Sequence, residues 1–105
     1  MSAQDAEQRA RARKVPILDV RDDAEWQEGH IPGALHTYVG DLGDRLRDLP
    51  KGEPLIVHCT VGNRAGLAAS ILQRAGFERV YNLLGGFRAW SALGLPTTSV
   101  ERDSA

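Results

Sequence analysis

The chain has 105 residues, a formal net charge of −1 and a single cysteine. A chain of this length forms one domain that buries roughly two thirds of the surface of its unfolded state. The small net charge excludes a general attraction to nucleic acid or to anionic membranes, so we expect neither as a partner. One cysteine excludes an internal disulfide, and His30, His36 and His58 lack metal-ligand spacing, so we expect no metal and no cofactor.

The amino terminus lacks the apolar segment of a secretion signal, and no apolar stretch is long enough to cross a bilayer. We therefore expect a cytoplasmic protein. A reducing compartment also suits a free thiol.

Residues 1–14 are polar and rich in alanine, and they are expected to form an N-terminal helix or tail. Ser2 and Asp5 have the spacing of a helix-capping pair, which favours the helix. Because the apolar face of this helix holds only alanine, a frayed tail fits the same residues. A domain is expected over residues 15–97, followed by a polar C-terminal tail over 98–105.

Strands and helices alternate along residues 15–97. Apolar runs predict strands over 15–20, 35–39, 55–57 and 80–83. Helical spacing and capping residues predict helices over 22–28, over 41–49, from Ala65 onward and after Gly86. In the helix from Ala65, the apolar face is expected to hold Leu67, Ile71 and Leu72. This alternation predicts an α/β fold, a three-layer open parallel sheet with helices on both faces.

Cys59 follows the strand expected over 55–57 and precedes a helix. Free backbone N–H groups and the positive end of the helix dipole converge at such a position and stabilise a thiolate. Gly62 permits the backbone angles that turn loop amides inward. The position by itself fits two interpretations equally, a reactive nucleophile and a small buried hydrophobic side chain.

Two further features are expected beside Cys59. Asp19 and Arg21 end the strand over 15–20, and ligands of open α/β sheets bind beyond the carboxyl ends of the strands. The pair Gly85 and Gly86 predicts a close approach of two backbone segments beyond another strand end.

These segments together resemble a single rhodanese domain, the sulfurtransferase module, over about residues 15–97. The resemblance rests on five segments in order: Leu18-Asp19-Val20-Arg21, Glu25-Trp26 with Gly29-His30-Ile31-Pro32-Gly33-Ala34, Cys59-Thr60-Val61-Gly62-Asn63-Arg64, Gly76-Phe77, and Leu84-Gly85-Gly86 through Trp90 to Gly94-Leu95-Pro96. It implies a five-stranded parallel sheet and a catalytic Cys59 that cycles between thiol and persulfide. Thiosulfate or glutathione persulfide would donate sulfur, and cyanide or a cellular thiol would accept it.

The resemblance also assigns roles to other residues. The active-site loop that would hold the persulfide consists of Thr60, Val61, Gly62, Asn63, Arg64 and Ala65. Arg64 either attracts an anionic donor or braces the loop through Glu25 or Asp19. Asp19, Arg21 and Glu25 are expected to support the loop. His30 is expected to be structural, and the side chain of His58 to point to the other face of its strand. Trp26, Phe87 and Trp90 are expected in the core or the pocket wall.

Departures from the family pattern leave alternatives open. Related phosphatases and arsenate reductases have five residues between cysteine and arginine; the four residues between Cys59 and Arg64 make these activities a minor alternative. Ala65 replaces the serine or threonine of many members. The usual first edge strand is missing, so the sheet has four strands or is completed by a neighbour.

A second class of function is a non-catalytic binding or sulfur-carrier module for a partner enzyme. Residues 33–50 resemble rhodanese modules appended to metallo-hydrolase or persulfide dioxygenase domains. They suggest a sulfur-metabolism protein as partner.

Overall fold

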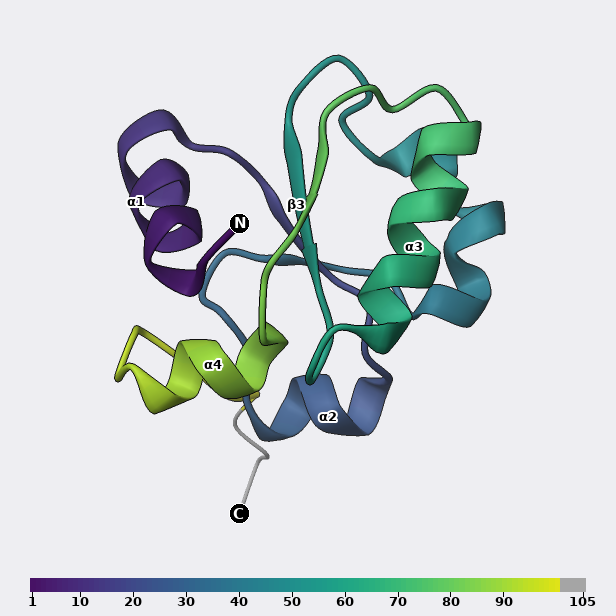
Figure 1. The fold of residues 1–105 in the computed structure, drawn as a ribbon. Coiled ribbons are helices and arrows are strands. Elements are labelled where there is room, and N and C mark those ends of the chain that lie inside the picture. Colours follow the sequence, from purple (N-terminus) through teal and green to yellow (C-terminus); the bar gives the residue numbers. More distant parts are fainter. Residues whose placement is uncertain (101–105) are drawn as a thin grey trace.

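A computed structural model describes residues 1–100 and shows a parallel sheet between two layers of helices (Figure 1). Within these residues the sheet has four strands in the order β2-β1-β3-β4, all parallel. The strands are β1 (Ile17–Asp19), β2 (Leu35–His36), β3 (Leu55–His58) and β4 (Val80–Asn82). The prediction of an α/β fold is confirmed. The sequence left open a sheet of four or five strands, and the described residues form four.

Helices cover both faces of the sheet. One face is covered by α1 (Ala3–Arg13) and α4 (Gly86–Ala92), and the other by α3 (Asn63–Arg74) and two 3-10 helices, η1 (Val39–Asp44) and η2 (Leu46–Asp48). The short helix α2 (Asp23–Glu28) lies at the end of the sheet where β3 meets the start of α3 (Figure 1). Among the described residues, no helix combines the length and apolar character needed to cross a membrane.

The amino-terminal segment is a helix rather than a frayed tail. The hydroxyl of Ser2 accepts the N–H of Asp5 at 3.1 Å, as the sequence predicted. Ala3 and Ala6 are buried in the cluster that also holds Trp90 of α4. Small alanine side chains therefore let α1 pack closely against the sheet and α4.

Alternation along the central strands divides the core in two. Leu18, Val57 and Cys59 face α3, whereas Ile17 and Ile56 face α1 and α4. Because β1 and β3 are buried on both faces, their sequences read as continuous apolar runs. This arrangement places the side chain of Cys59 on the α3 face.

The face expected for the helix after Cys59 is wrong in one residue. Leu67 is 58% exposed, and the buried side chains of α3 are Ala65, Ala68 and Leu72. Spacings of three and four residues keep those three on one stripe, while Leu67 lies about 200° from Ala65 around the helix.

The amphipathic α-helix expected over 41–49 is also wrong. The chain instead forms η1 and η2, interrupted at Arg45. Gly40 and Gly43 lower the helix propensity of this segment, and tight 3-10 turns still bury Leu42 and Leu49 against α3.

The edge strand and the C-terminal stretch also differ from expectation. The strand expected over 35–39 is limited to Leu35–His36 at the sheet edge. A polar tail was expected from residue 98 onward. Thr98 instead exchanges two backbone hydrogen bonds with His30, at 2.7 and 2.8 Å, so the first residue of this stretch is attached to the domain. Residues 101–105 of the expected tail lie outside the described residues.

Candidate active site around Cys59

The thiol of Cys59 lies in a cradle of backbone amides directly after β3. Gly62 donates its N–H to the sulfur at 3.1 Å, and Ala65 donates its N–H at 3.4 Å. Gly62 has a φ of 130°, a region closed to most side chains, and this conformation turns its amide inward. Cys59 is only 1% exposed. The cradle can stabilise negative charge on sulfur with donors that are already in place.

The connection between strand and helix is shorter than the sequence indicated. Helix α3 begins at Asn63, so Asn63, Arg64 and Ala65 belong to its first turn. The side chains of Val61 and Asn63 are exposed. Because Ala65 lies in the first turn of α3, its N–H has no partner within the helix and is free to donate to the sulfur of Cys59.

Arg64 braces this loop through Glu25 of α2. Nη1 and Nη2 of Arg64 donate to the two carboxylate oxygens of Glu25 at 2.6 and 2.9 Å. The hydroxyl of Thr60 accepts from Nη2 of Arg64 at 2.9 Å and donates to Glu25 at 2.8 Å. The Arg64 guanidinium lowers the pKa of Glu25 from 4.5 to about 2, with smaller help from Thr60 and Asp22. Of the two acids considered as partners of Arg64, the structure therefore selects Glu25.

A capping box holds Glu25 itself in place. Asp22 accepts the N–H of Glu25 at 2.9 Å, and Glu25 accepts the N–H of Asp22 at 3.2 Å. Glu25 thus belongs to the first turn of α2 and to the Cys59 loop at once. The beginnings of α2 and α3 are tied together through one carboxylate.

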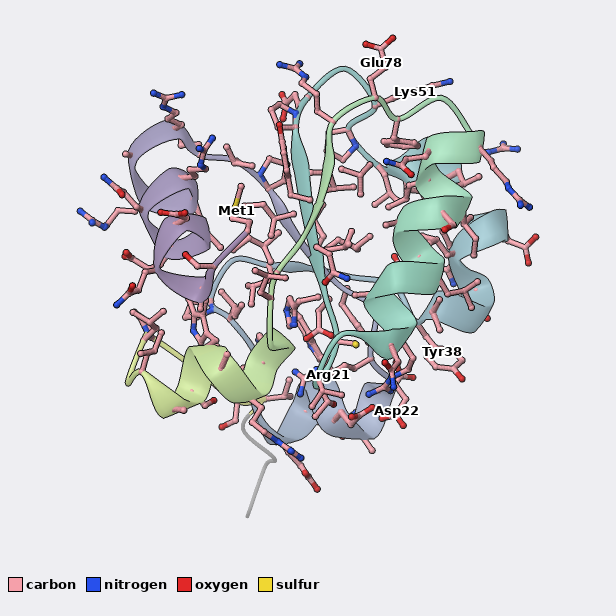
Figure 2. All side chains as sticks on the ribbon, in the orientation of Figure 1. Met1, Arg21, Asp22, Tyr38, Lys51 and Glu78 are labelled. Carbon is pink, nitrogen blue, oxygen red and sulfur yellow. The ribbon has the colours of Figure 1, made fainter. Side chains whose placement is uncertain are left out.

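Asp19 and Arg21 form a second, fully buried pair at the same end of the sheet. Nε and Nη2 of Arg21 donate to the Asp19 carboxylate at 3.0 and 2.8 Å, and Nη2 also donates to the carbonyl of Gly29 at 2.6 Å. The guanidinium lies 4.3 Å from the ring centroid of Phe87 (Figure 2 labels Arg21). This pair lies on the α4 face of the sheet, opposite the face to which Cys59 belongs, and fixes the turn after α2.

His58 lies between that pair and the backbone of Cys59. Its side chain faces Phe87 of α4, so its predicted orientation is confirmed. Nε2 of His58 lies 3.6 Å from Oδ2 of Asp19 and has no hydrogen-bond partner, and Nδ1 lies 3.3 Å from the carbonyl oxygen of Cys59. Burial lowers the pKa of His58, although the charge of Asp19 acts in the opposite direction. The local sequence around His58 does not predict this contact with Asp19, because the two residues lie 39 positions apart.

The first turn of α4 is hydrogen-bonded to the backbone of the Cys59 loop. Phe87 donates its N–H to the carbonyl of Cys59 at 2.8 Å, and Arg88 donates its N–H to the carbonyl of Thr60 at 3.1 Å. A Cβ at Gly86 would collide with the Cys59 carbonyl oxygen and lie 2.6 Å from that of Thr60. The close backbone approach predicted from the doubled glycine is confirmed.

Aromatic side chains beside α2 form a stack. The Trp26 ring stacks on His30 and on His36, with centroid distances of 3.5 and 4.7 Å. Nδ1 of His30 lies 2.7 Å from the carbonyl of Trp26. Trp90 is buried in the core and donates to the carbonyl of Pro96 at 2.7 Å.

In residues 1–100, no cluster of His, Cys, Asp and Glu is arranged to hold a metal ion.

Comparison with known proteins agrees with this geometry. The model of the rhodanese-like domain family matches residues 2–93. The chain belongs to the rhodanese-like domain family. The thiosulfate sulfurtransferase GlpE of Coxiella burnetii is 38% identical over 80 residues, which cover 76% of this chain and 75% of that protein.

Two further proteins extend the comparison of this rhodanese-like chain. The candidate sulfur carrier protein YrkF of Bacillus subtilis is 35% identical over 75 residues, which cover 71% of this chain but only 40% of YrkF. The Alr3790 protein of Anabaena has a similar fold, with a TM-score of 0.88 and 34% identity over 97% of this chain and 94% of that one. The chain thus matches a whole small domain in some relatives and a part of others.

Proposed function

We propose that this rhodanese-like protein is a sulfurtransferase that carries sulfane sulfur as a persulfide on Cys59. The observation that carries the proposal is the cradle in which the amides of Gly62 and Ala65 donate to the sulfur of Cys59. A thiolate and a terminal persulfide are both anionic sulfur species that such donors stabilise. The name of GlpE supports thiosulfate as one donor.

The reaction proceeds in two displacements at sulfur. The Cys59 thiolate attacks the outer sulfur of thiosulfate, a new S–S bond forms, and sulfite leaves with the electron pair of the broken S–S bond. With glutathione persulfide as donor, the leaving group is the glutathione thiolate. Cyanide or an acceptor thiolate then attacks the terminal sulfur of the persulfide, which releases thiocyanate or a new persulfide and restores the Cys59 thiolate.

The remaining predicted site residues shape the loop in this proposal. Thr60, Arg64 and Glu25 hold the loop through their shared hydrogen bonds. Val61 and Asn63 form its exposed rim. Asp19 and Arg21 act at a distance, by fixing the turn beside α2 and Phe87 under the Cys59 carbonyl.

The size of the cradle favours a single sulfur atom over a tetrahedral oxyanion. Only four residues separate Cys59 from Arg64, and both guanidinium nitrogens that donate there are used by Glu25 and Thr60. A phosphate group would need more converging donors than this arrangement offers.

A sulfur-carrier role uses the same cysteine and is favoured by one observation, the similarity to the candidate carrier YrkF. In that case the acceptor is a partner enzyme of sulfur metabolism instead of a small thiol. We place either role in the cytoplasm, where a free thiol stays reduced.

Intact-mass measurement of the protein after exposure to thiosulfate, to glutathione persulfide and then to cyanide tests the proposal. We expect the native protein to gain the mass of one sulfur atom and to lose it with cyanide, while a Cys59→Ser variant gains none. No added sulfur from either donor would overturn the sulfurtransferase proposal. Fast loading with slow transfer to both cyanide and glutathione would favour the carrier role.

A further inference from the structure

The helix beside the Cys59 loop, α2, carries an excess of negative charge (Figure 1). Its N-cap and its six residues include four acidic side chains and no basic one. The acidic residues are Asp22, Asp23, Glu25 and Glu28. Of these four, only Glu25 pairs with a lysine or arginine of residues 1–100, namely Arg64. Asp23 lies 3.9 Å from His36, which is charged only when protonated. Three carboxylates of this segment therefore lack a basic partner within the described structure.

Helix stability accounts for only part of this charge. Asp22 caps α2, and acidic side chains in a first turn interact favourably with the helix dipole. Glu28 lies in the last turn, where the same dipole disfavours negative charge, and no basic residue accompanies it there. The acidic character of α2 thus extends beyond what the helix itself requires.

The charge of α2 acts at the entrance to the Cys59 cradle. Thr60, the residue after Cys59, donates its hydroxyl to Glu25 of α2 at 2.8 Å. The charges of Glu25 and, to a smaller extent, Asp22 raise the pKa of Arg64 in the loop. A helix of six residues is about 9 Å long, close to the screening length of about 8 Å at physiological salt. Carboxylates on α2 are therefore felt by any charged group that approaches the loop.

The cations beside the loop do not cancel this charge. Arg64 is balanced by Glu25, and Arg21 is balanced by Asp19. Arg88 of α4 is exposed, and its N–H is hydrogen-bonded to the loop at 3.1 Å, so it contributes one positive charge. The three unpaired carboxylates outweigh it, and the side of the loop next to α2 remains acidic.

Exposed apolar side chains lie next to this acidic helix. Val61 in the loop is 47% exposed, and Leu67 near the start of α3 is 58% exposed. Tyr38 is also exposed, and Figure 2 shows it with Asp22 at the end of α3 where that helix begins. Because Cys59 is almost completely buried, an acceptor has to contact the rim of the loop to reach the sulfur. The surface that meets an acceptor is thus apolar with an acidic border.

We propose that the sulfur acceptor of Cys59 is a cysteine thiol in a basic segment of a partner protein. This inference rests on the proposed function, because it names the acceptor of the same persulfide. Lysine or arginine side chains of the partner would lie against Asp23 and Glu28, and apolar side chains beside its cysteine would cover Val61 and Leu67.

The transfer step exchanges one S–S bond for another. The partner thiolate attacks the terminal sulfur of the Cys59 persulfide and forms a new S–S bond. The Cys59 thiolate leaves with the electron pair of the broken S–S bond, and the partner cysteine becomes the persulfide. The complementary charges bring the partner thiol to the loop and speed the encounter.

Sulfur transfer to two synthetic peptides tests the proposal. Each peptide contains one cysteine beside a leucine; one peptide carries two lysines, and the other carries two glutamates in their place. The full chain is first loaded from thiosulfate or glutathione persulfide, and transfer is then followed by intact mass. Rates are compared per thiolate, using the measured pKa of each peptide thiol. At an ionic strength of about 0.01 M, we expect the lysine peptide to accept sulfur about tenfold faster, and the ratio to fall as salt is added.

Matched charge variants identify α2 as the source of this preference. Asp23→Asn combined with Glu28→Gln should lower the ratio of the two peptide rates about threefold or more. The control combines Glu53→Gln with Glu78→Gln, which removes the same charge at the other end of the molecule, where Figure 2 shows Glu78. The control should keep the native ratio. Both double variants retain the whole cradle and should load sulfur as the native protein does.

Leu67→Ser tests the apolar contact. This variant should accelerate neither step and should slow transfer to the lysine peptide about threefold, because the leucine of the peptide loses its partner. Transfer to cysteamine, a small cationic thiol, should stay unchanged. Leu93→Ser is the control, since Leu93 is 51% exposed and follows α4 instead of α3.

The loading step separates this inference from the proposed function. No sulfur gained by Cys59 would overturn the proposed function and the acceptor with it. Normal loading followed by equal rates for the two peptides, or a ratio that the α2 variant leaves unchanged, would overturn the acceptor inference alone. Unchanged transfer from Leu67→Ser to the lysine peptide would overturn the contact with a partner segment and would indicate selection of small cationic thiols instead.

Discussion

Arg64 and Glu25 lie 39 residues apart in the chain and form a two-point ion pair with distances of 2.6 and 2.9 Å. The pair joins the first turn of α3 to the first turn of α2 beside the Cys59 loop. Glu25 in turn raises the pKa of Arg64. Because the carboxylate takes up the guanidinium charge, the backbone amides of Gly62 and Ala65 are left as the donors that reach the sulfur.

Replacing Arg64 with lysine should slow sulfur loading of Cys59. A lysine ammonium cannot make both hydrogen bonds to Glu25 and the bond to Thr60 with the geometry of a guanidinium. We expect the loading rate, followed by intact mass, to fall about tenfold, which corresponds to about 1.4 kcal/mol. Arg74→Lys at the other end of α3 is the control. Equal rates for the two variants would contradict a bracing role for Arg64.

The Glu25 carboxylate should make stability depend on pH in the acid range. Its pKa falls from 4.5 to about 2 on folding, so its contribution is complete above about pH 4.5 and is lost as the pH falls toward 2. Glu25→Gln should cost about 1 kcal/mol at neutral pH, since the pair is partly exposed. Urea unfolding at several pH values should show this difference shrinking below pH 4.5; a difference that stays constant would speak against the ion pair.

His58 should make the folded protein sensitive to mild acid. Burial lowers its pKa in the folded state, whereas the unfolded chain takes up the proton near its ordinary value of 6.5. Stability is therefore complete above pH 6.5 and falls as the pH drops below it. The free energy of unfolding of His58→Gln should fall less than that of the native protein between pH 7 and about 5. The comparison uses the slope with pH, so a general loss of stability in the variant does not obscure it; identical slopes would exclude His58 as the source.

Gly86→Ala should damage both the fold and the candidate site. The new Cβ would collide with the carbonyl oxygen of Cys59, and the φ of 58° adds strain for any side chain. We expect a loss of about 2–3 kcal/mol in unfolding free energy together with slower sulfur loading. Gly43→Ala is the matched control, because nothing lies within 4 Å of its Cβ position. If both alanine variants behaved alike, the contact between α4 and the Cys59 loop would not matter for loading.

The sequence by itself determined the order and type of most elements and the position of Cys59. Buried central strands and capped helices are encoded by neighbouring residues, as in the run 55–58 and in the cap formed by Asp22. The place of Cys59 directly after a buried strand follows from the same local pattern. Gly85 and Gly86 likewise predicted a close approach of two backbone segments, although the sequence did not show that the second segment is Cys59 and Thr60.

Only the tertiary structure decided which distant side chains meet. Asp19 and Glu25 were equal candidates as partners of Arg64, and packing of α2 beside α3 selected Glu25 while Asp19 bound Arg21. The 41–49 segment has the leucine spacing of an α-helix, yet Gly43 and the packing of the segment against α3 produce 3-10 turns. The exposure of Leu67 and the burial of His58 beside Asp19 both depend on contacts between elements far apart in the chain. Local periodicity indicates which segments tend to form strands or helices. The final form of a segment such as 41–49, and the partner of each buried charge, are decided when the segments pack together.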